Sequence, residues 1–238
     1  MKIKWLGHSC FLLTSANGLR LLTDPFNEKV RFPLPEVEAD VVTVSHQHFD
    51  HNNTSIVRGS PKIFSVLGQY EYRNLRLLGV PSFHDRTGGS ERGRNIIFKI
   101  TMDGLNIVHC GDLGHILHEK TIKEIGAVDV LLVPVGGYYT IDASDAALVV
   151  KQLRPKVTIP MHFKTGELDF PIDTVDRFIK EVGEAKEVDG QEIELTRDNI
   201  EEMAGVHVLK APEFPKKTDE QASEPPSGEK KAVETPGD

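Results

Sequence analysis

Three histidines and an aspartate fall within six consecutive positions of this chain, His46-Gln47-His48-Phe49-Asp50-His51. Neutral imidazole and carboxylate are ligands that zinc, manganese and iron share. His46 and His48 point to the same side of an extended segment, so they can hold one metal ion. Asp50 and His51 follow after the chain has begun to turn, where they can face a second ion. A solvated His-rich loop is the alternative, and this density of ligands disfavours it.

The segment before this cluster must position it. Val41-Val42-Thr43-Val44-Ser45 is short, apolar and β-branched, which predicts a strand buried on both faces. The cluster therefore lies at the carboxyl end of a buried strand, where α/β folds place their sites. Asp112 and His162 also come directly after apolar runs that predict strands.

These residues resemble the His-x-His-x-Asp-His signature of the metallo-β-lactamase superfamily, and the resemblance runs from about Lys2 to about Leu209. Three further motifs carry it: Leu22-Thr23-Asp24-Pro25, Cys110-Gly111-Asp112 and Pro160-Met161-His162. Two others resemble a branch of stand-alone hydrolases that includes ascorbate-6-phosphate lactonase: Gly7-His8-Ser9-Cys10-Phe11 and Pro134-Val135-Gly136-Gly137.

The resemblance implies a dinuclear metal site. The predicted ligands divide into two sets, His46, His48 and His84 for the first ion and Asp50, His51, Asp112 and His162 for the second. His84 matches the position at which the branch completes its first triad, and its competitor His109 is expected to pack within an apolar strand or to face solvent. Asp112 matches the bridging aspartate, and a carboxylate has two oxygens with which to ligate two ions.

Three other residues are expected beside the metals. The early aspartate of the superfamily mostly supports the metal loop, so Asp24 is expected in that role, although it could simply cap a turn before Pro25. His8 is either a neighbour of the site or a hydrogen-bonded structural residue. Tyr138 follows two glycines that could bring backbone N–H groups to a substrate or could merely form a turn, and it is expected near the substrate pocket.

The order of hairpins and then alternating strands and helices predicts two mixed β-sheets packed face to face. Asn17-Gly18 and Asp103-Gly104 each lie between apolar runs and predict hairpin turns. The resemblance implies an α/β fold of this kind, the αββα sandwich with helices on both outer faces and metals at the sheet edge. Residues 1–211 are expected to form the hydrolase domain, and residues 212–238 a disordered tail rich in Pro, Glu and Lys.

The chain has 238 residues and a formal net charge of −8. This acidic balance without a basic stripe argues against nucleic acid as a partner. The first residues are strand-like rather than a basic segment followed by an apolar stretch, and no run reaches membrane-spanning length. We therefore expect a cytoplasmic protein that does not bind membranes. Cys10 and Cys110 could in principle form a bridge, but nothing in the sequence suggests a disulfide framework, and two cysteines fit a reducing compartment. The oligomeric state stays open, a homo-oligomer included.

The expected activity is metal-dependent hydrolysis. Two ions can hold a bridging water, lower its pKa and stabilise the oxygen charge that develops, and Asp50 is the best candidate to orient the nucleophile. A small-molecule ester or lactone is the favoured substrate, and zinc is the favoured metal, with manganese and iron as alternatives. The other readings are a phosphodiesterase or nuclease of the same fold, a diiron redox enzyme, and a non-catalytic metal-stabilised scaffold. Arg86, Arg92 and Arg94 could contact an anionic substrate or simply face water.

Overall fold

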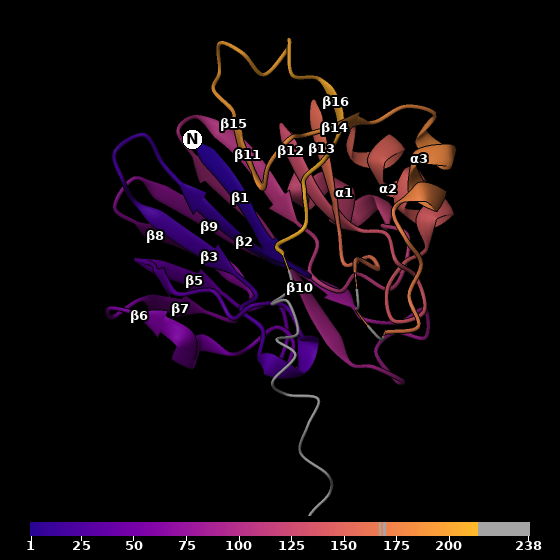
Figure 1. The fold of residues 1–238 in the computed structure, drawn as a ribbon, viewed down its shortest axis with the longest axis horizontal. Coiled ribbons are helices and arrows are strands. Elements are labelled where there is room, and N and C mark those ends of the chain that lie inside the picture. Colours follow the sequence, from indigo (N-terminus) through magenta and orange to yellow (C-terminus); the bar gives the residue numbers. More distant parts are fainter. Residues whose placement is uncertain (167, 169, 214–238) are drawn as a thin grey trace, which may run out of the picture.

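The computed structural model describes residues 1–166, 168 and 170–213, and these form two large β-sheets packed face to face (Figure 1). The α/β sandwich expected from the sequence is confirmed, but the described α-helices pack on the second sheet, so the expected α-helical layer on the first sheet is wrong for the described residues. Most of the tail expected at residues 212–238 lies outside the described residues. None of the described helices is long and apolar enough to cross a membrane.

The first sheet comes mainly from the N-terminal part of the chain. Its strands in spatial order are β15 (Glu192–Glu194), β1 (Lys2–Gly7), β2 (Cys10–Thr14), β3 (Arg20–Thr23), β5 (Val41–Thr43) and β7 (Lys62–Phe64). The predicted turn at Asn17-Gly18 joins β2 to β3 as an antiparallel hairpin, with Gly18 at a φ of +85°. Glycine accepts this conformation because it has no Cβ.

The second sheet contains, in spatial order, β14 (Lys186–Glu187), β16 (Gly205–Val208), β13 (Val157–Met161), β12 (Val130–Pro134), β11 (Leu105–His109), β10 (Arg94–Met102), β9 (Leu75–Phe83) and β8 (Gly68–Tyr72). β10 and β11 form the hairpin predicted at Asp103-Gly104. β11, β12 and β13 are parallel, and every residue of β12 and β13 is buried. These strands lie within the protein on both faces, which explains why they are continuously apolar.

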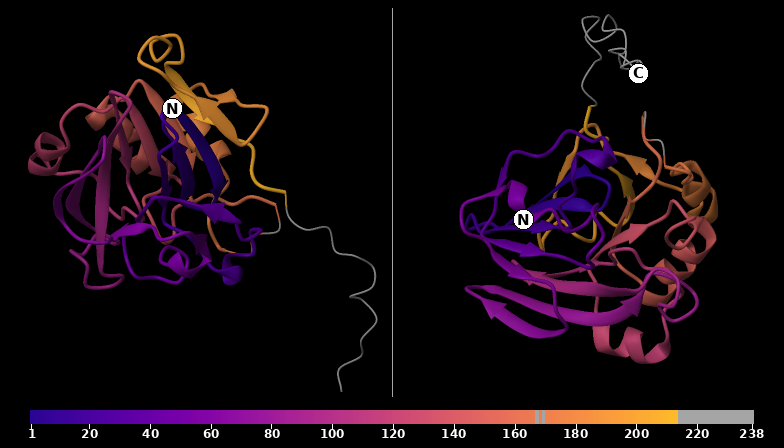
Figure 2. Two further views of the ribbon diagram at one scale, coloured as in Figure 1. Left: turned by 90° about the vertical axis from the view of Figure 1, so that its left-hand side faces the viewer. Right: turned by 90° about the horizontal axis from the view of Figure 1, so that it is seen from below.

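The α-helices within the described residues are α1 (Glu119–Ile125), α2 (Ala143–Leu153) and α3 (Asp176–Val182), and all belong to the second half of the chain (Figures 1 and 2). The Asp142 carboxylate caps α2 by accepting a hydrogen bond from the backbone N–H of Asp145 at 3.0 Å. α3 begins at Asp176 rather than at Pro171, where the sequence predicted its start.

The outer face of the first sheet is covered by irregular chain rather than by an α-helix of the described residues. This layer contains the 3₁₀ helices η1 (Glu28–Val30) and η2 (Thr54–Ile56) and a small sheet of β4 (Val37–Glu38) and β6 (Val57–Arg58). Its apolar cluster includes Leu22, Phe26, Val30, Phe32 and Val42. Pro33 and Pro35 explain why no α-helix forms between β3 and β5, because proline lacks the N–H donor and clashes in a helix interior.

Candidate metal centre

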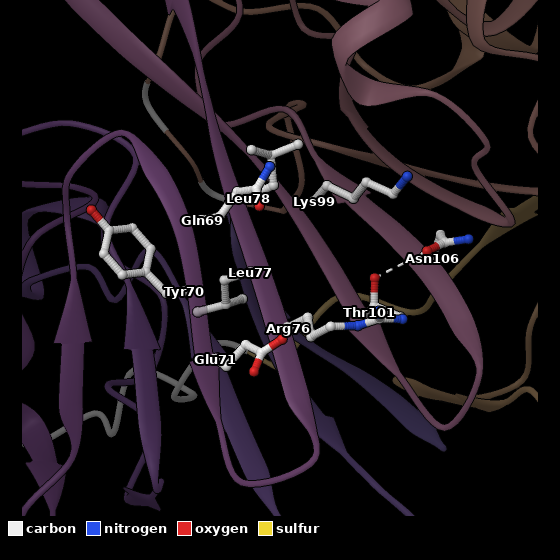
Figure 3. A pocket seen from close by; sticks show the side chains of 9 residues that line it. All are labelled: Gln69, Tyr70, Glu71, Arg76, Leu77, Leu78, Lys99, Thr101 and Asn106. Atoms are coloured by element: carbon white, nitrogen blue, oxygen red, sulfur yellow. Dashed lines mark hydrogen bonds between the residues drawn. The ribbon is translucent and has the colours of Figure 1, made fainter.

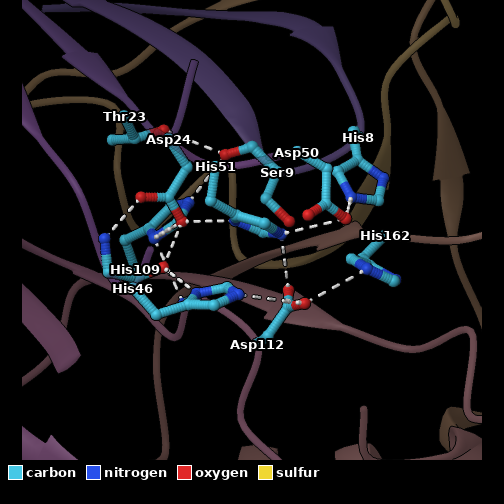
Figure 4. Close-up of polar contacts among 12 residues, drawn as sticks. His8, Ser9, Thr23, Asp24, His46, Asp50, His51, His109, Asp112 and His162 are labelled. Carbon is cyan, nitrogen blue, oxygen red and sulfur yellow. Dashed lines mark hydrogen bonds and ion pairs between the residues drawn. The ribbon is translucent and has the colours of Figure 1, made fainter. Parts of the chain in front are cut away.

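The predicted site residues meet where six strands from the two sheets end (Figure 4). β1, β3 and β5 run in one direction in the first sheet, and β9, β11 and β13 share a direction in the second. The residues that follow these carboxyl ends are His8, Asp24, His46–His51, His84, Asp112 and His162. The topology therefore brings together residues that lie far apart in the sequence.

The first predicted metal set is brought together. The ligand atoms of His46, His48 and His84 all lie within 4.8 Å of one another. His46 and His84 are buried, whereas His48 is exposed on the side that opens to solvent. Three imidazoles at this separation can hold one divalent ion and leave a coordination position free. Metal binding by this set stays a prediction.

Asp112 lies between the two predicted sets. Its Oδ2 atom is 3.0 Å from Nε2 of His84 and 3.4 Å from Nε2 of His162. Its Oδ1 atom is 3.2 Å from Nε2 of His51. One carboxylate thus reaches imidazoles from both sets, which is the arrangement expected of a bridging ligand. Gly111 permits this approach, because a Cβ there would lie 2.6 Å from that of Ser45.

The second set contains one more histidine than the sequence predicted. His8, Asp50, His51 and His162 form a group whose ligand atoms lie within 4.8 Å of one another. Nε2 of His8 lies 3.1 Å from Oδ2 of Asp50, and the His8 ring lies 4.1 Å from the His162 ring, centroid to centroid. The sequence left His8 open between a site neighbour and a structural residue. His8 directly follows β1, whose end lies at the same edge as the other strand ends, and this position was the sequence signal that could have placed it in the site.

Asp24 has the supporting position that the resemblance implied. Its carboxylate is fully buried and accepts hydrogen bonds from the backbone N–H of Ser45 at 2.7 Å and from the Ser45 hydroxyl at 2.6 Å. The same carboxylate lies 2.9 Å from Nδ1 of His51. Asp24 therefore fixes both the start of the metal loop and one of its imidazoles, as residues behind metal ligands commonly do. His109 is buried and lies 2.8 Å from the Ser9 carbonyl oxygen, so it packs as expected.

Burial and neighbouring charge shift the pKa values of the histidines at the site in different directions. Burial and the positive charge of His51 lower the pKa of His46 to about 3, so its imidazole is neutral and able to bind metal. Burial opposes protonation of His51 as well, but the charges of Asp112 and Asp50 outweigh it and raise its pKa well above the usual value. His51 and its neighbouring histidines likewise lower the pKa of Asp112 against the opposing effect of burial. The carboxylate of Asp112 is thus ionised despite its burial, which suits it to bind a cation.

The residues fit a metal ion by a second criterion. Nε2 of His46, Nε2 of His51 and Oδ1 of Asp112 are buried and have no hydrogen-bond partner. Buried polar atoms of this kind are rare because their desolvation is costly. His46 belongs to the first predicted set, and His51 and Asp112 belong to the second, so ions bound to the two sets would satisfy these atoms.

Two concave pockets open beside these residues. The metal pocket has a volume of about 460 Å³ and is lined by Gln47, His48, Phe49, Asp50, His84, Arg92, Asp112, Tyr139 and Phe170. The wide pocket has a volume of about 890 Å³, and its wall includes His46, Gln47, His48, Val66, Leu67, Phe83, Arg92 and Arg94. A third hollow of about 510 Å³ lies over the second sheet, between Tyr70 and Asn106 (Figure 3). Its lining has no histidine, so the chemistry lies in the first two.

Tyr138 does not take the place expected for it. Its side chain is 65% exposed, whereas the next residue, Tyr139, lines the metal pocket. The glycines before it form a turn, because the Gly137 N–H donates to the Ile141 carbonyl at 3.2 Å. Gly136 is required for packing, since a Cβ there would lie 2.3 Å from the carbonyl oxygen of His162.

A family model described as the beta-lactamase superfamily domain matches residues 2–162. The chain belongs to the metallo-β-lactamase superfamily. A UPF0173 metal-dependent hydrolase of Archaeoglobus fulgidus is 31% identical to it, over 82% of this chain and 94% of that protein. The superfamily assignment and these relatives identify the chain as a metal-dependent hydrolase.

Solved structures of the superfamily agree with the fold. A Thermotoga maritima protein, described as a zinc-dependent hydrolase of the superfamily, is 40% identical, with a TM-score of 0.76 over 88% of this chain and 98% of that one. Igni18, a metallo hydrolase of Ignicoccus hospitalis, is 23% identical, with a TM-score of 0.63 over 89% of this chain and 96% of that one. At that identity the second likeness concerns the fold alone.

Proposed function

We propose that this metal-dependent hydrolase is dinuclear and cleaves an ester or lactone of a small molecule. The observation that carries the proposal is the position of Asp112, whose two oxygens reach His84 and His51 at 3.0 and 3.2 Å. A site for a single ion would need only one of the two Asp112 oxygens and the histidine beside it. Zinc suits the imidazole and carboxylate donors, and the 40% identical relative is described as zinc-dependent.

The chain's own residues would divide the work as follows. His46, His48 and His84 would hold one ion, and Asp50, His51, Asp112 and His162 would hold the other, with His8 beside Asp50. Bound ions supply Lewis-acid chemistry that activates water and stabilises a developing oxyanion. Asp50 is ionised, because His51 and His8 lower its pKa despite burial. Its carboxylate lines the metal pocket and orients a water by accepting a hydrogen bond.

The pockets favour a small molecule over a polymer. The metal pocket and the wide pocket, of about 460 and 890 Å³, fall in the range of small-molecule sites. The formal net charge of −8 disfavours a polyanionic strand. A carbonyl substrate is therefore favoured over a nucleic-acid phosphodiester. A cytoplasmic location stays a prediction.

Metal content of purified protein tests the dinuclear site. We expect two ions per chain by elemental mass spectrometry, a loss at the first set in His48→Ala and a loss at the second in His162→Ala. His115→Ala is the matched control, because His115 lies outside both pockets that contain predicted ligands. One ion per chain in the wild type, lost in both variants, would contradict the dinuclear proposal.

Substrate panels test the reaction. We expect turnover of aryl esters and γ-lactones, and little turnover of bis(4-nitrophenyl) phosphate at matched concentration. His48→Ala, folded by circular dichroism, should be inactive. Strong phosphodiester hydrolysis without ester or lactone hydrolysis would replace the proposal with the phosphodiesterase alternative.

A further inference from the structure

We propose that the substrate carries an oxyanionic group, which Arg92 binds beside the metal centre, and an apolar group, which the wide pocket receives. This substrate class rests on the proposed function, because it concerns the same site. It is supported by the residues that the two pockets share, the Arg92 guanidinium that donates no hydrogen bond within the described residues, the loop that fixes the Arg92 backbone, and the exposed apolar wall beyond it.

The metal pocket and the wide pocket adjoin each other. Both are lined by Gln47, His48 and Arg92. His48 belongs to the first predicted metal set, so this shared wall lies beside the reacting centre. A molecule with its scissile bond at the metals can therefore extend past Arg92 into the larger volume.

The Arg92 guanidinium has donors available for a ligand. Within the described residues it donates no hydrogen bond, and its ion pair is with the adjacent Glu91 at 3.8 Å. Its side chain is one-third exposed and lies 5.8 Å from the centroid of the Tyr139 ring. The aromatic contact orients a planar group that has five N–H donors. A carboxylate or phosphate is the partner that such a fork binds in a bidentate manner.

A hydrogen-bonded loop holds Arg92 at a fixed place relative to the metal ligands. Asp85 directly follows His84, and its Oδ2 atom accepts from the backbone N–H of Arg92 at 2.8 Å. Its Oδ1 atom accepts from the backbone N–H of Gly89 at 2.7 Å. The loop closes at its base, where the His84 N–H donates to the Gly93 carbonyl at 3.0 Å. A cation fixed in advance loses less conformational entropy when it binds an anion.

The other arginine of this loop is already neutralised. Nη2 of Arg86 lies 2.6 Å from Oδ2 of Asp145. Arg86 lines a separate hollow, together with His115 and His118, rather than either pocket beside the metals. Arg86→Gln is therefore a matched control that removes the same charge from the same loop.

The wide pocket offers an apolar wall next to Arg92. Val66 and Leu67, between β7 and β8, are 54% and 49% exposed, and Phe83 at the end of β9 is 36% exposed. All three line this pocket. Large apolar side chains that gather on an accessible concave surface mark binding sites. An amphipathic anion matches both this wall and Arg92.

Binding of matched small molecules tests the substrate class without requiring turnover. We would titrate the purified metal-containing protein by calorimetry with 4-phenylbutyrate, its neutral analogue 4-phenylbutanamide, the corresponding phosphonate, and acetate. We expect the two phenyl anions to bind roughly tenfold or more tightly than the amide. Arg92→Gln should remove this preference, Arg92→Lys should restore part of it, and Arg86→Gln should leave it unchanged. The carboxylate and phosphonate arms identify the preferred oxyanion.

The same titrations test the apolar group of the substrate separately. We expect acetate to bind much more weakly than 4-phenylbutyrate, and Leu67→Ser to weaken the amide and the carboxylate by the same factor. Equal binding of acetate and 4-phenylbutyrate would overturn the apolar subsite. An anion preference that persists in Arg92→Gln, or that only Arg94→Gln removes, would overturn the role of Arg92.

Hydrolysis then separates this inference from the proposed function. We would compare kcat/KM for mono-4-nitrophenyl glutarate and for neutral 4-nitrophenyl butyrate, in the wild type and in Arg92→Gln. A preference for the anionic ester that depends on Arg92 supports both this inference and the proposed function. Equal turnover of the two esters in both proteins overturns the inference alone. Absence of turnover with an intact Arg92-dependent binding preference overturns the proposed function alone.

Discussion

Nδ1 of His51 donates a hydrogen bond to the Asp24 carboxylate across 2.9 Å, although 27 residues separate the two in the chain. The donated proton fixes the tautomer, so Nε2 of His51 faces Oδ1 of Asp112 at 3.2 Å. Once a cation displaces the proton at Nε2, an imidazole held in this way presents its lone pair without having to reorient. The end of β3 therefore sets the orientation of a ligand that follows β5.

We expect Asp24→Asn to weaken metal binding by about 10–100-fold, the usual cost of losing the partner of a ligating histidine. The carboxylate accepts from both Ser45 and His51, and an amide turns an N–H₂ donor toward one of these donors. Competition with a chromophoric zinc chelator measures the effect. Asp103→Asn is the control, because it removes the same charge at a carboxylate that binds the Ala16 N–H away from the site. Equal metal affinity in both variants would contradict the supporting role of Asp24.

Removal of metal should lower the melting temperature. Asp24 and Asp112 are buried and Asp50 is half-buried, and a cation that binds only the folded state stabilises it by about 2.7 kcal/mol at a hundred times its Kd. Calorimetric melts with and without EDTA measure this shift. In Asp112→Ala the second set loses a ligand and the first set keeps its three imidazoles, so EDTA should lower the melting temperature by less than in the wild type. An equal EDTA effect on Asp112→Ala and wild type would show that the stabilising ion binds elsewhere.

Gly111→Ala should be strongly destabilising. Gly111 has a φ of +54°, and a Cβ there would lie 2.4 Å from Oδ1 of Asn95, so backbone strain of about 1–2 kcal/mol adds to overpacking of about 1–3 kcal/mol. Gly18→Ala is the matched control, because its φ is +85° but nothing lies within 4 Å of the added Cβ. Urea unfolding of both in excess chelator compares the folds without metal. Equal losses of unfolding free energy in Gly111→Ala and Gly18→Ala would mean that the region around Asn95 relaxes to admit the methyl group.

Both cysteines should be unreactive in the native protein. Burial and the nearby charge of Asp24 raise the pKa of Cys10, and burial raises the pKa of Cys110. Almost no thiolate is then present at pH 8, and the thiolate is the reactive form. We expect a chromogenic disulfide reagent to label neither thiol until the protein is unfolded in guanidinium, when it should label both. Rapid labelling of the folded protein would show that one of these sites opens.

The strand ends that carry the predicted ligands were readable from the sequence because their signals are local. Val41–Thr43 is a buried β-branched run. The motifs that follow it in the sequence indicated the fold and the predicted ligand set. Both predicted hairpin turns are present, since Asn-Gly and Asp-Gly report a backbone conformation directly.

The features that the sequence left open, such as the place of His8, or missed, such as Tyr139, depend on contacts between distant segments. His8 meets Asp50 only because β1 and β5 end at the same edge of one sheet. Tyr139, not Tyr138, lines the metal pocket because a tight turn decides which neighbouring side chain faces inward. The hydrogen bonds of Asp85 come from a Gly-rich loop that has no repeating pattern to read.

Backbone hydrogen bonds join the two sheets next to the metal centre. The Ile96 N–H donates to the Ser45 carbonyl at 3.0 Å, and the His162 N–H donates to the His8 carbonyl at 3.2 Å. Neither sheet by itself contains a complete set of ligands, so the site cannot form before the halves of the chain dock. Contacts between such distant segments form slowly. Trp5 packs on Phe163 across the same junction, with their ring centroids 5.1 Å apart. During refolding, a metal-sensitive signal should therefore not rise before the tryptophan signal that reports this docking.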